Sequence, residues 1–453
     1  MCSVVGILAS TAKCAEYREV VIGRQTRGRG LRSALPISGL TLRSCGAILP
    51  PQVRRPERGN HGPRASLRQK GSQRMKFGFF LMPCRRPEEN PALGYQHDLE
   101  FVQYVESLGF DEVWVGEHHS GGWEPIPAPD LFIAAAAERT KRIKLGTGVV
   151  SLAFHDPFEV AERMAFLDQL TMGRILFGVG PGVQPTDVKM FDIPYEKLRP
   201  RMDEALDIIL KLYHADGPIS YEGQFWSYKD REIQVKPFQR PHMPIAVAST
   251  GRPHSIEVTG QHGLFMLSAA FQSPASPDQL RKQWESLEQH ARLHRKTVRR
   301  EDWRIAQYLY IAETKKKAYD DVAEGAMREL RDYFFHLGVK PGYEAFVGQP
   351  AEEITFDQAL AKRGWVIGDP DDCIRWMEDA QQRSGGFGGF LIVATEWTSR
   401  ENWRKCLELF AKYVMPEINR TNRGLKRSWQ QMLKDSAANA LPAPYGPGPK
   451  VGG

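Results

Sequence analysis

The sequence predicts a closed (β/α)8 barrel, a TIM barrel with insertions, over residues 75–420. Two observations predict this α/β fold class. Apolar runs of strand length alternate with stretches of helical periodicity from Met75 onward, and eight such runs can be counted. A barrel of this class takes about 250 to 400 residues with insertions, which the region provides. An open doubly wound sheet is the structural alternative, but no GxGxxG motif opens the first helix.

In the first half of this region, strands and helices follow one another without long gaps. The runs of strand length cover residues 76–82, 111–119, 143–152 and 174–180. The helical stretches cover residues 99–110, 130–140 and 156–173. The last of them has Pro157 in its first turn and Gly173 after its end, which is typical of helix boundaries.

The second half repeats the alternation with more insertion. The four further strands are expected at residues 243–249, 263–268, 304–312 and 388–394. Helices are expected at residues 198–213, 277–294, 315–336, 370–382 and 401–413. Residues 217–241 are turn-rich and predict a small hairpin, whereas residues 337–366 are too long for a simple loop. Insertions of this length often cover the active site of a barrel enzyme.

The net charge of +7 is concentrated at the N-terminus. Residues 1–74 hold 14 of the 61 Lys and Arg residues and three of the 54 acidic residues, so the remaining chain has 47 basic and 51 acidic residues. We therefore expect residues 1–74 to be a disordered basic extension and residues 421–453 to be a C-terminal tail with a mobile end. A nucleic-acid-binding arm, an organellar targeting segment and translation from a misplaced start codon remain open for the extension, with the last favoured by the strand directly after Met75.

Composition favours a cytoplasmic globular protein. The six cysteines are scattered and form no CxxC pair, which fits a reducing compartment better than a zinc cluster or a disulfide framework. No stretch reaches the roughly 18 apolar residues that a membrane helix needs. We expect neither nucleic acid nor a membrane as a partner.

Four strand ends carry residues suited to chemistry. They are Glu117-His118-His119, Gly146-Thr147-Gly148-Val149, Gly178 to Gly182, and Ala248-Ser249-Thr250-Gly251. A histidine can relay protons, glycines let a ligand approach the backbone, and small hydroxyl residues at a helix N-terminus suit a phosphate. Taken singly, the same residues fit a surface loop, a bulge, a tight turn and a helix cap. Because the carboxyl ends of barrel strands meet at one edge, together they predict one pocket. The HH pair lacks the i, i+4 spacing of metal ligands, so no metal site is expected.

These segments resemble the bacterial luciferase-like flavin-dependent monooxygenases. The resemblance is carried, in order, by MKFGFFLM, GFDEVWVGEHH, LGTGVV, FLDQLTMGRILFGVGPG and PIAVAS, and it covers about residues 75–420. Within that family, KPFQRPHMPIAVAS and WVIGDPDD are most similar to the limonene 1,2-monooxygenase-like group.

The resemblance implies a two-component enzyme. Reduced FMN, or in some relatives FAD, would come from a separate NAD(P)H:flavin reductase, and O2 would form a C4a-hydroperoxyflavin that oxygenates the substrate. His118 matches the active-site histidine of the family, and Gly148-Val149 matches a non-prolyl cis peptide beside the flavin ring. Ser249, Thr250 and Gly251 match the phosphate-binding corner.

The sequence departs from the light-emitting members at two positions. They have a cysteine where this chain has Gly180 and an arginine where it has Pro181, so light emission is not expected and Arg252 is the candidate to replace the lost phosphate partner. Relatives also associate as homodimers, which the resemblance implies here. A deazaflavin- or flavin-dependent dehydrogenase and a non-catalytic flavin-binding protein remain alternatives on the same fold.

Aromatic and apolar side chains are the candidates for a substrate chamber that excludes water. They are Phe79, Met82, Trp123, Phe154, Trp365 and Trp397. The expected substrate is a small apolar molecule such as a terpene, ketone or aldehyde. Each aromatic residue also fits ordinary packing.

Overall fold

The computed structural model describes residues 74–270 and 277–438, and these contain a closed barrel of eight parallel strands. The barrel strands are β1 (Lys76–Leu81), β2 (Glu112–Val115), β3 (Lys144–Thr147), β5 (Ile175–Gly180), β8 (Ile245–Ser249), β9 (Phe265–Ala269), β10 (Trp303–Gln307) and β13 (Gly389–Val393). Each strand pairs with its successor in this series, and β13 pairs with β1 to close the barrel. The predicted fold class is confirmed.

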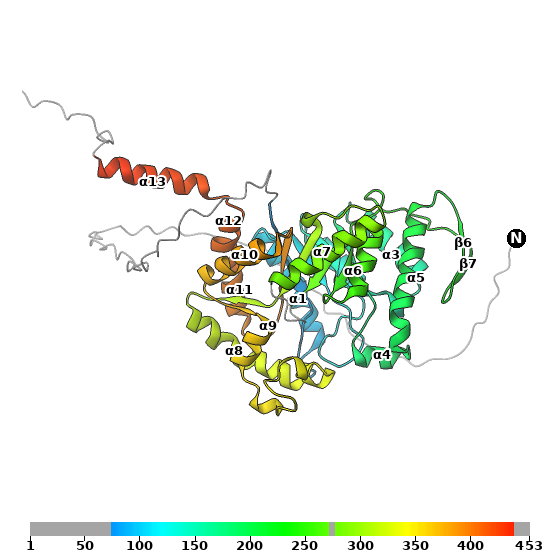
Figure 1. The fold of residues 1–453 in the computed structure, drawn as a ribbon, viewed down its shortest axis with the longest axis horizontal. Coiled ribbons are helices and arrows are strands. Elements are labelled where there is room, and N and C mark those ends of the chain that lie inside the picture. Colours follow the sequence, from blue (N-terminus) through cyan, green and yellow to red (C-terminus); the bar gives the residue numbers. More distant parts are fainter. Residues whose placement is uncertain (1–73, 271–276, 439–453) are drawn as a thin grey trace, which may run out of the picture. The chain divides into compact units, whose positions relative to one another are not determined.

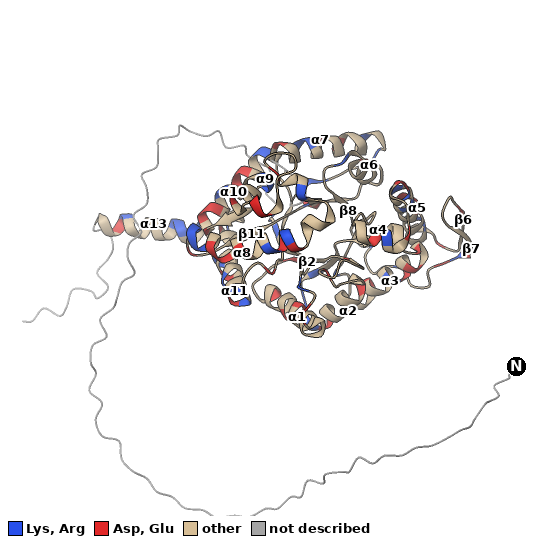
Figure 2. Ribbon diagram, turned by 90° about the horizontal axis from the view of Figure 1, so that it is seen from below, with Lys and Arg blue, Asp and Glu red and all other residues tan. Residues whose placement is uncertain are grey.

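Helices form the outer ring around this sheet, and residues of both charges are spread over them (Figures 1 and 2). The ring consists of α1 (Pro91–Ser107), α2 (Pro129–Arg139), α3 (Pro157–Leu170), α5 (Tyr195–His214), α6 (Pro253–His262), α7 (Pro277–Leu293), α8 (Lys315–Asp332), α10 (Pro370–Ser384) and α11 (Arg400–Leu409). Many of these helices begin at a proline, whose fixed φ suits the first turn. The helix expected from residue 99 begins earlier, at Pro91, because Asn90 caps it by accepting a bond from the Ala92 amide.

The excursions lie where the sequence breaks its alternation. β6 (Ile219–Glu222) and β7 (Ser227–Arg231) form the predicted antiparallel hairpin. The run expected as one strand over residues 304–312 is two strands, because β11 (Leu309–Ile311) leaves the barrel and pairs with β12 (Val366–Gly368). The insertion before β12 contains three short 3-10 turns and α9, at Phe334–Leu337, Lys340–Gly342, Ala351–Glu353 and Phe356–Arg363.

Short elements complete the described chain. β4 (Val150–Ser151) continues beyond β3 and pairs with β5. The 3-10 turns Leu152–Phe154 and Arg300–Asp302, α4 (Pro185–Phe191), the π-helical turn Phe410–Val414, α12 (Met415–Ile418) and α13 (Arg423–Ala437) are the others. No residue of α13 is buried. The predictions for residues 1–73 and for the chain end at 439–453 lie outside the described residues.

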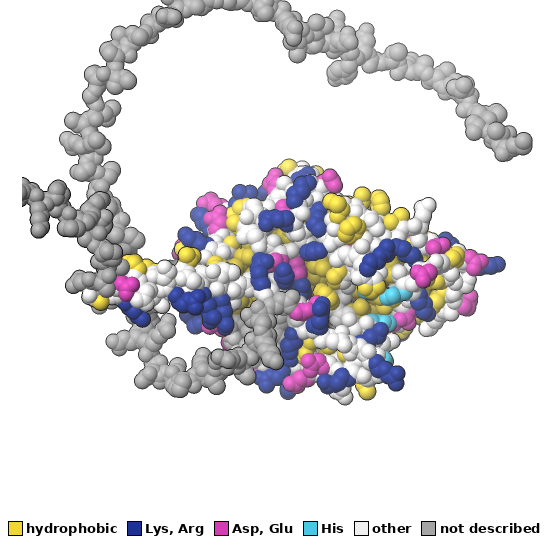
Figure 3. Space-filling view, turned by 90° about the horizontal axis from the view of Figure 1, so that it is seen from above, with side chains coloured by type: hydrophobic (Ala, Val, Ile, Leu, Met, Phe, Trp, Pro, Cys, Tyr) yellow, Lys and Arg dark blue, Asp and Glu magenta, His cyan; other side chains and the backbone are white. Residues whose placement is uncertain are grey.

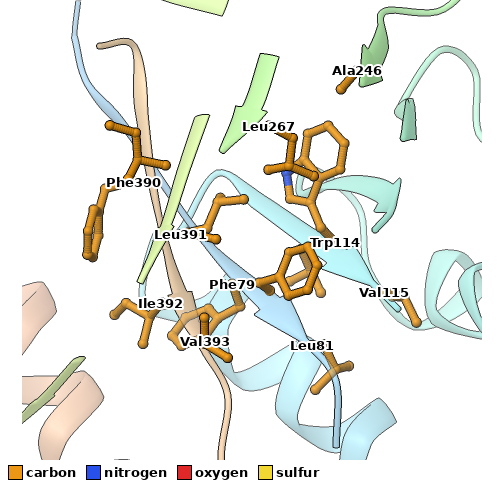
Figure 4. Packing of buried hydrophobic residues seen from close by; sticks show 14 of the residues in the cluster. Phe79, Leu81, Trp114, Val115, Ala246, Leu267, Phe390, Leu391, Ile392 and Val393 are labelled. Atoms are coloured by element: carbon orange, nitrogen blue, oxygen red, sulfur yellow. The ribbon is translucent and has the colours of Figure 1, made fainter. Parts of the chain in front are cut away.

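The core fills the barrel and the layer between the sheet and its helices (Figure 4). Phe79 belongs to the outer layer, where its ring packs 5.0 Å from Phe101 of α1 and 4.8 Å from Phe110, measured between ring centroids. The prediction that Phe79 lines a substrate chamber is therefore wrong. Inside the barrel, Arg304 of β10 forms a buried two-pronged ion pair with Glu112 of β2, at 2.7 and 2.8 Å.

The surface mixes apolar and charged side chains, as the face in Figure 3 shows. Among the described helices, none is long and apolar enough to cross a membrane. The three cysteines of the described region, Cys84, Cys373 and Cys406, are buried free thiols.

Candidate active site

The predicted site residues converge at the carboxyl edge of the barrel. His118, Gly148, Gly180 and Ser249 lie at or directly after the ends of β2, β3, β5 and β8, which are consecutive strands of the barrel. Two of them contact neighbouring segments of this edge, because the Gly148 amide donates to the Val115 carbonyl at 2.6 Å and Gly180 pairs with Ser151. The sequence therefore located one edge, as parallel strands require.

His118 is held by groups on both sides of its ring. Its backbone amide donates to the Ile126 carbonyl at 3.0 Å, and its Nδ1 lies 3.1 Å from a carboxylate oxygen of Asp187 in α4. A carboxylate can only accept, so Nδ1 carries a proton. The Nε2 atom is left facing Glu124, whose carboxylate is 3.7 Å away.

The charges around His118 favour its protonated form. Burial of the ring lowers its pKa, but the carboxylates of Glu124, Asp187 and Glu117 outweigh burial, so the pKa of His118 is raised. Burial raises the pKa of Asp187, but hydrogen bonds from His118 and Ser120 and the His118 charge outweigh burial, so the pKa of Asp187 is lowered. The pair therefore favours an imidazolium beside a carboxylate.

Glu117 ties two loops of the site together. One of its oxygens accepts from His119 Nε2 at 3.1 Å, from His155 Nε2 at 2.9 Å and from the Ser151 amide at 3.3 Å. Glu117, His119 and His155 could also surround a cation, since their ligand atoms lie within 4.8 Å of one another. The hydrogen bonds already give the buried carboxylate its partners, and a cavity of about 180 Å³ lies beside Glu117 and His155.

At the ends of β3 and β5, glycine residues leave the backbone of this edge without side chains. The Gly148–Val149 peptide bond is cis, as the resemblance implies. A Cβ on Gly148 would lie 2.9 Å from Phe80, and a Cβ on Gly180 would lie 2.7 Å from Val149. Met82 lies here too, because a Cβ on Gly116 would meet its Cγ at 2.4 Å. Side chains are excluded from these positions by contacts within the barrel mouth.

The N-terminus of α6 makes the fourth part of the edge. Its N-cap residue, Arg252, is exposed and offers no side-chain cap, and the first turn contains no acidic residue. Ser249 Oγ accepts from the Gly251 amide at 3.1 Å and from Ser255 Oγ at 2.8 Å. Beside Gly251 lies Gln283, whose buried Oε1 has no partner among the described residues.

Aromatic residues cover the opposite side of the mouth. Tyr333 of the segment after α8 donates to Glu124 at 2.8 Å, and its ring stacks on Trp123 with centroids 5.5 Å apart. The ring centroids of Trp365 and Trp397 lie 4.7 Å apart, and both side chains are buried. Phe154 lies instead beside His119, with ring centroids 6.3 Å apart, and stacks on Phe191 of α4 at 4.4 Å.

A buried acid lies beneath this aromatic cover. Burial, together with the carboxylates of Glu124 and Glu396, raises the pKa of Glu329 in α8 to about 8. Glu329 is therefore mostly protonated near neutral pH. The thiol of Cys84, which follows β1, is also buried, and burial raises its pKa.

The sequence prediction omitted Asp187, Glu124, Glu329 and Tyr333. Asp187 had a usable signal, since Pro185 and an acidic residue two positions later are typical of a helix start. Glu124, Glu329 and Tyr333 had none, because their proximity depends on how α8 packs over the barrel mouth.

Comparison with known proteins fits this geometry. Residues 75–386 match the family model described as luciferase-like monooxygenase. The chain belongs to the luciferase-like monooxygenase family. This luciferase-like monooxygenase is 37% identical over 375 residues to 4-hydroxyprotoasukamycin monooxygenase of Streptomyces nodosus subsp. asukaensis, covering 82% of this chain and 100% of that protein. It is 36% identical to limonene 1,2-monooxygenase of Rhodococcus erythropolis, covering 81% of this chain and 92% of that protein.

A solved structure gives the same fold. The oxygenating constituent of 3,6-diketocamphane monooxygenase from Pseudomonas putida, in complex with FMN, has a TM-score of 0.64 and 25% identity to this luciferase-like monooxygenase. The match covers 76% of this chain and 99% of that one. The predicted family is therefore confirmed, and the chain is a monooxygenase.

Proposed function

We propose that the protein is the oxygenase component of a two-component flavin monooxygenase, receives reduced FMN from a separate reductase, and oxygenates a small apolar organic substrate with O2. One observation carries the proposal: His118, held by Asp187, lies at the same barrel edge as an uncapped helix N-terminus. A relative from Acinetobacter baylyi, 30% identical over 199 residues, is named an oxygenase component.

The residues present fit a flavin phosphate. Free amides at the N-terminus of α6 point out of a ten-residue helix, and no acidic residue in the first turn opposes an anion. Ser249, Thr250, Gly251 and the exposed Arg252 surround this terminus. The unpartnered Oε1 of Gln283 can only accept a hydrogen bond, so it would take a flavin hydroxyl rather than the phosphate. A reduced flavin bound here would supply electrons to O2.

His118 would hold a proton at the barrel edge and donate it in a hydrogen bond. Asp187 fixes Nδ1 and raises the proton affinity of the ring, so the imidazolium keeps a second proton on Nε2. Nε2 lies 3.7 Å from the Glu124 carboxylate and would donate a hydrogen bond to oxygen bound beside it. Glu117 holds the loop that carries His118 by binding His119 and His155.

The aromatic cover would exclude water and receive the substrate. Trp123 stacks on Tyr333, so the segment after α8 packs on the loop after β2. Exclusion of water protects a reactive oxygen species from unproductive loss. Trp123, Trp365, Trp397 and Met82 are the apolar surfaces offered to a substrate.

Stopped-flow absorbance tests the proposal. The protein with photoreduced FMN is mixed with oxygenated buffer, and the expected result is a transient band distinct from those of reduced and oxidised FMN. The His118→Asn variant should shorten its lifetime by about 10²-fold, the usual scale of a positioned acid. His214→Asn, an exposed histidine on α5, is the matched control. Immediate return to oxidised FMN in the parent protein would contradict the proposal and favour the dehydrogenase alternative.

A further inference from the structure

A cavity of about 100 Å³ lies between α1 and α11, next to the ends of β1 and β13. It lies away from His118 and the phosphate corner, which follow β2 and β8. Three guanidinium groups and three carboxylates line it, and its other polar side chains include His97, Thr395 and Trp403. None of these side chains takes part in the proposed chemistry.

Four lining residues carry a buried polar atom without a hydrogen-bond partner in the described part of the chain. These atoms are Arg85 Nε, His97 Nδ1, Thr395 Oγ1 and Trp403 Nε1. Such atoms are rare in folded proteins and indicate a missing partner. All four residues line the same small cavity, so one ligand could serve them together.

Arg85 cannot give its Nε–H group a hydrogen-bond partner by rotating its side chain. Its Nη1 donates to Asp98 Oδ2 at 2.8 Å, its Nη2 donates to Asp98 Oδ1, and Nη2 also lies 3.4 Å from Glu396. Rotation of the guanidinium would break this buried ion pair. The Nε–H group is therefore fixed in place with its donor unused.

The unused atoms call for an acceptor. Arg Nε–H and Trp Nε1–H can only donate, and the Thr395 hydroxyl can donate as well. His97 is neutral near pH 7, because burial and the Arg400 charge lower its pKa, so its Nδ1 can take either role. A ligand that accepts several hydrogen bonds from one side matches this set.

The charged groups and the apolar walls of the cavity further restrict the class of ligand that fits. The guanidinium groups of Arg400 and Arg404 join Arg85 around the cavity, while Asp98 is paired with Arg85. Glu100 and Glu396 are the other carboxylates that face it. The remaining walls are apolar, from Leu81, Phe101, Leu407 and their neighbours. The volume equals about three water molecules of liquid.

We propose that this cavity is a binding site for a short-chain carboxylate, with the carboxylate on Arg85, Thr395, Arg400 and Trp403 and the alkyl chain on the apolar wall. Occupation would also brace the barrel mouth. The backbone amide of Arg85 donates a hydrogen bond to the Trp123 carbonyl at 2.8 Å, and Thr395 lies two residues before Trp397.

Isothermal titration calorimetry of the full chain, without flavin, tests the site with propionate as the probe. Saturable binding at one site is expected, with propionamide binding at least about tenfold more weakly because it lacks the charge. Thr395→Val and Arg400→Gln should each weaken propionate binding by about tenfold or more. Lys405→Gln, on α11 and paired with Glu401, is the matched control and should bind as the parent does.

The outcomes separate the proposal from its rivals. Absence of propionate binding, with the parent protein folded by circular dichroism, would overturn it and leave ordered water as the partner of the four atoms. Equal binding by parent, Thr395→Val and Arg400→Gln would overturn it too, because propionate would then bind elsewhere. Neither result depends on monooxygenase activity.

Discussion

The protonation of His118 depends on a residue that lies 69 positions further along the chain. Asp187 holds Nδ1 and adds a negative charge, so the folded-state pKa of His118 lies above its ordinary value. The stabilisation from this pair is complete below the unfolded pKa of about 6.5 and is lost as pH rises through the raised folded pKa.

Replacement of Asp187 by Asn should expose this dependence. The amide keeps the shape of the side chain but removes its charge, so the pKa of His118 should fall. The alkaline limb of the rate against pH should then move to lower pH, with a loss of about tenfold in rate at pH 8. A pH profile of FMN-dependent turnover measures it. An unchanged alkaline limb would show that another group controls it.

Glu329 is a buried acid that stays neutral in the folded protein. Rising pH ionises its carboxyl group, whereas it removes the charge of His118. Its folded pKa of about 8 lies above the unfolded value, so its contribution to stability is present at low pH and is lost as pH rises toward 8. Glu329→Gln removes the titration and keeps the shape. The variant should gain stability over the parent by about 1.4 kcal/mol per pH unit between pH 5 and 8, a slope set by linkage. Urea unfolding at four pH values checks this. A constant difference would contradict a neutral buried acid.

At the scale of elements, the contact of α8 with the barrel mouth depends on one glycine. A Cβ on Gly325 would lie 1.9 Å from the Trp397 carbonyl oxygen, so the helix lies directly against the segment after β13. Gly325 is thus required for the aromatic cover to reach Trp397.

Gly325→Ala should therefore force α8 away from this segment. A loss of about 1–3 kcal/mol in unfolding free energy is expected, the usual cost of overpacking. Gly424→Ala on α13 is the matched control, because a Cβ there meets nothing within 4 Å. The control should be neutral or slightly stabilising. Denaturant titration of both variants compares them, and equal stabilities would show that α8 is not held against Trp397.

The elements that the sequence predicted are those whose own residues specify them. Strands such as β1 and β5 are continuous apolar runs, and α3 has its proline, its Asp156 cap and its final glycine. β12 was not predicted because its three residues become a strand only by pairing with β11. Likewise, the chain alone does not reveal that Tyr333 reaches Glu124, since 209 residues separate them.

At the scale of the whole molecule, α2 and α3 leave apolar side chains in solvent. Leu131 is 71% exposed, Phe166 57%, Leu170 57% and the nearby Met172 76%. Exposed apolar residues gathered on neighbouring helices mark association surfaces. This face is where the homodimer implied by the resemblance would form.

In the predicted homodimer, a charge on this face should separate the subunits. Phe166→Asp is expected to raise the dimer dissociation constant at least about thirtyfold, since a buried aromatic at an interface is commonly worth 2 kcal/mol or more. Sedimentation velocity over a concentration series measures it. Leu293→Asp, 69% exposed at the end of α7, is the control. A monomeric parent protein, or equal behaviour of both variants, would rule out this face.

The barrel mouth is divided between two arcs of strands. β2, β3, β5 and β8 carry His118 and the predicted phosphate corner, whereas Tyr333, Trp365 and Trp397 of the aromatic cover lie in segments after β10 and β13. The two arcs meet where Tyr333 donates to Glu124 and stacks on Trp123, both in the loop after β2. A change that fits the cover to a new substrate would therefore also reach His118, because the Glu124 carboxylate lies 3.7 Å from its Nε2.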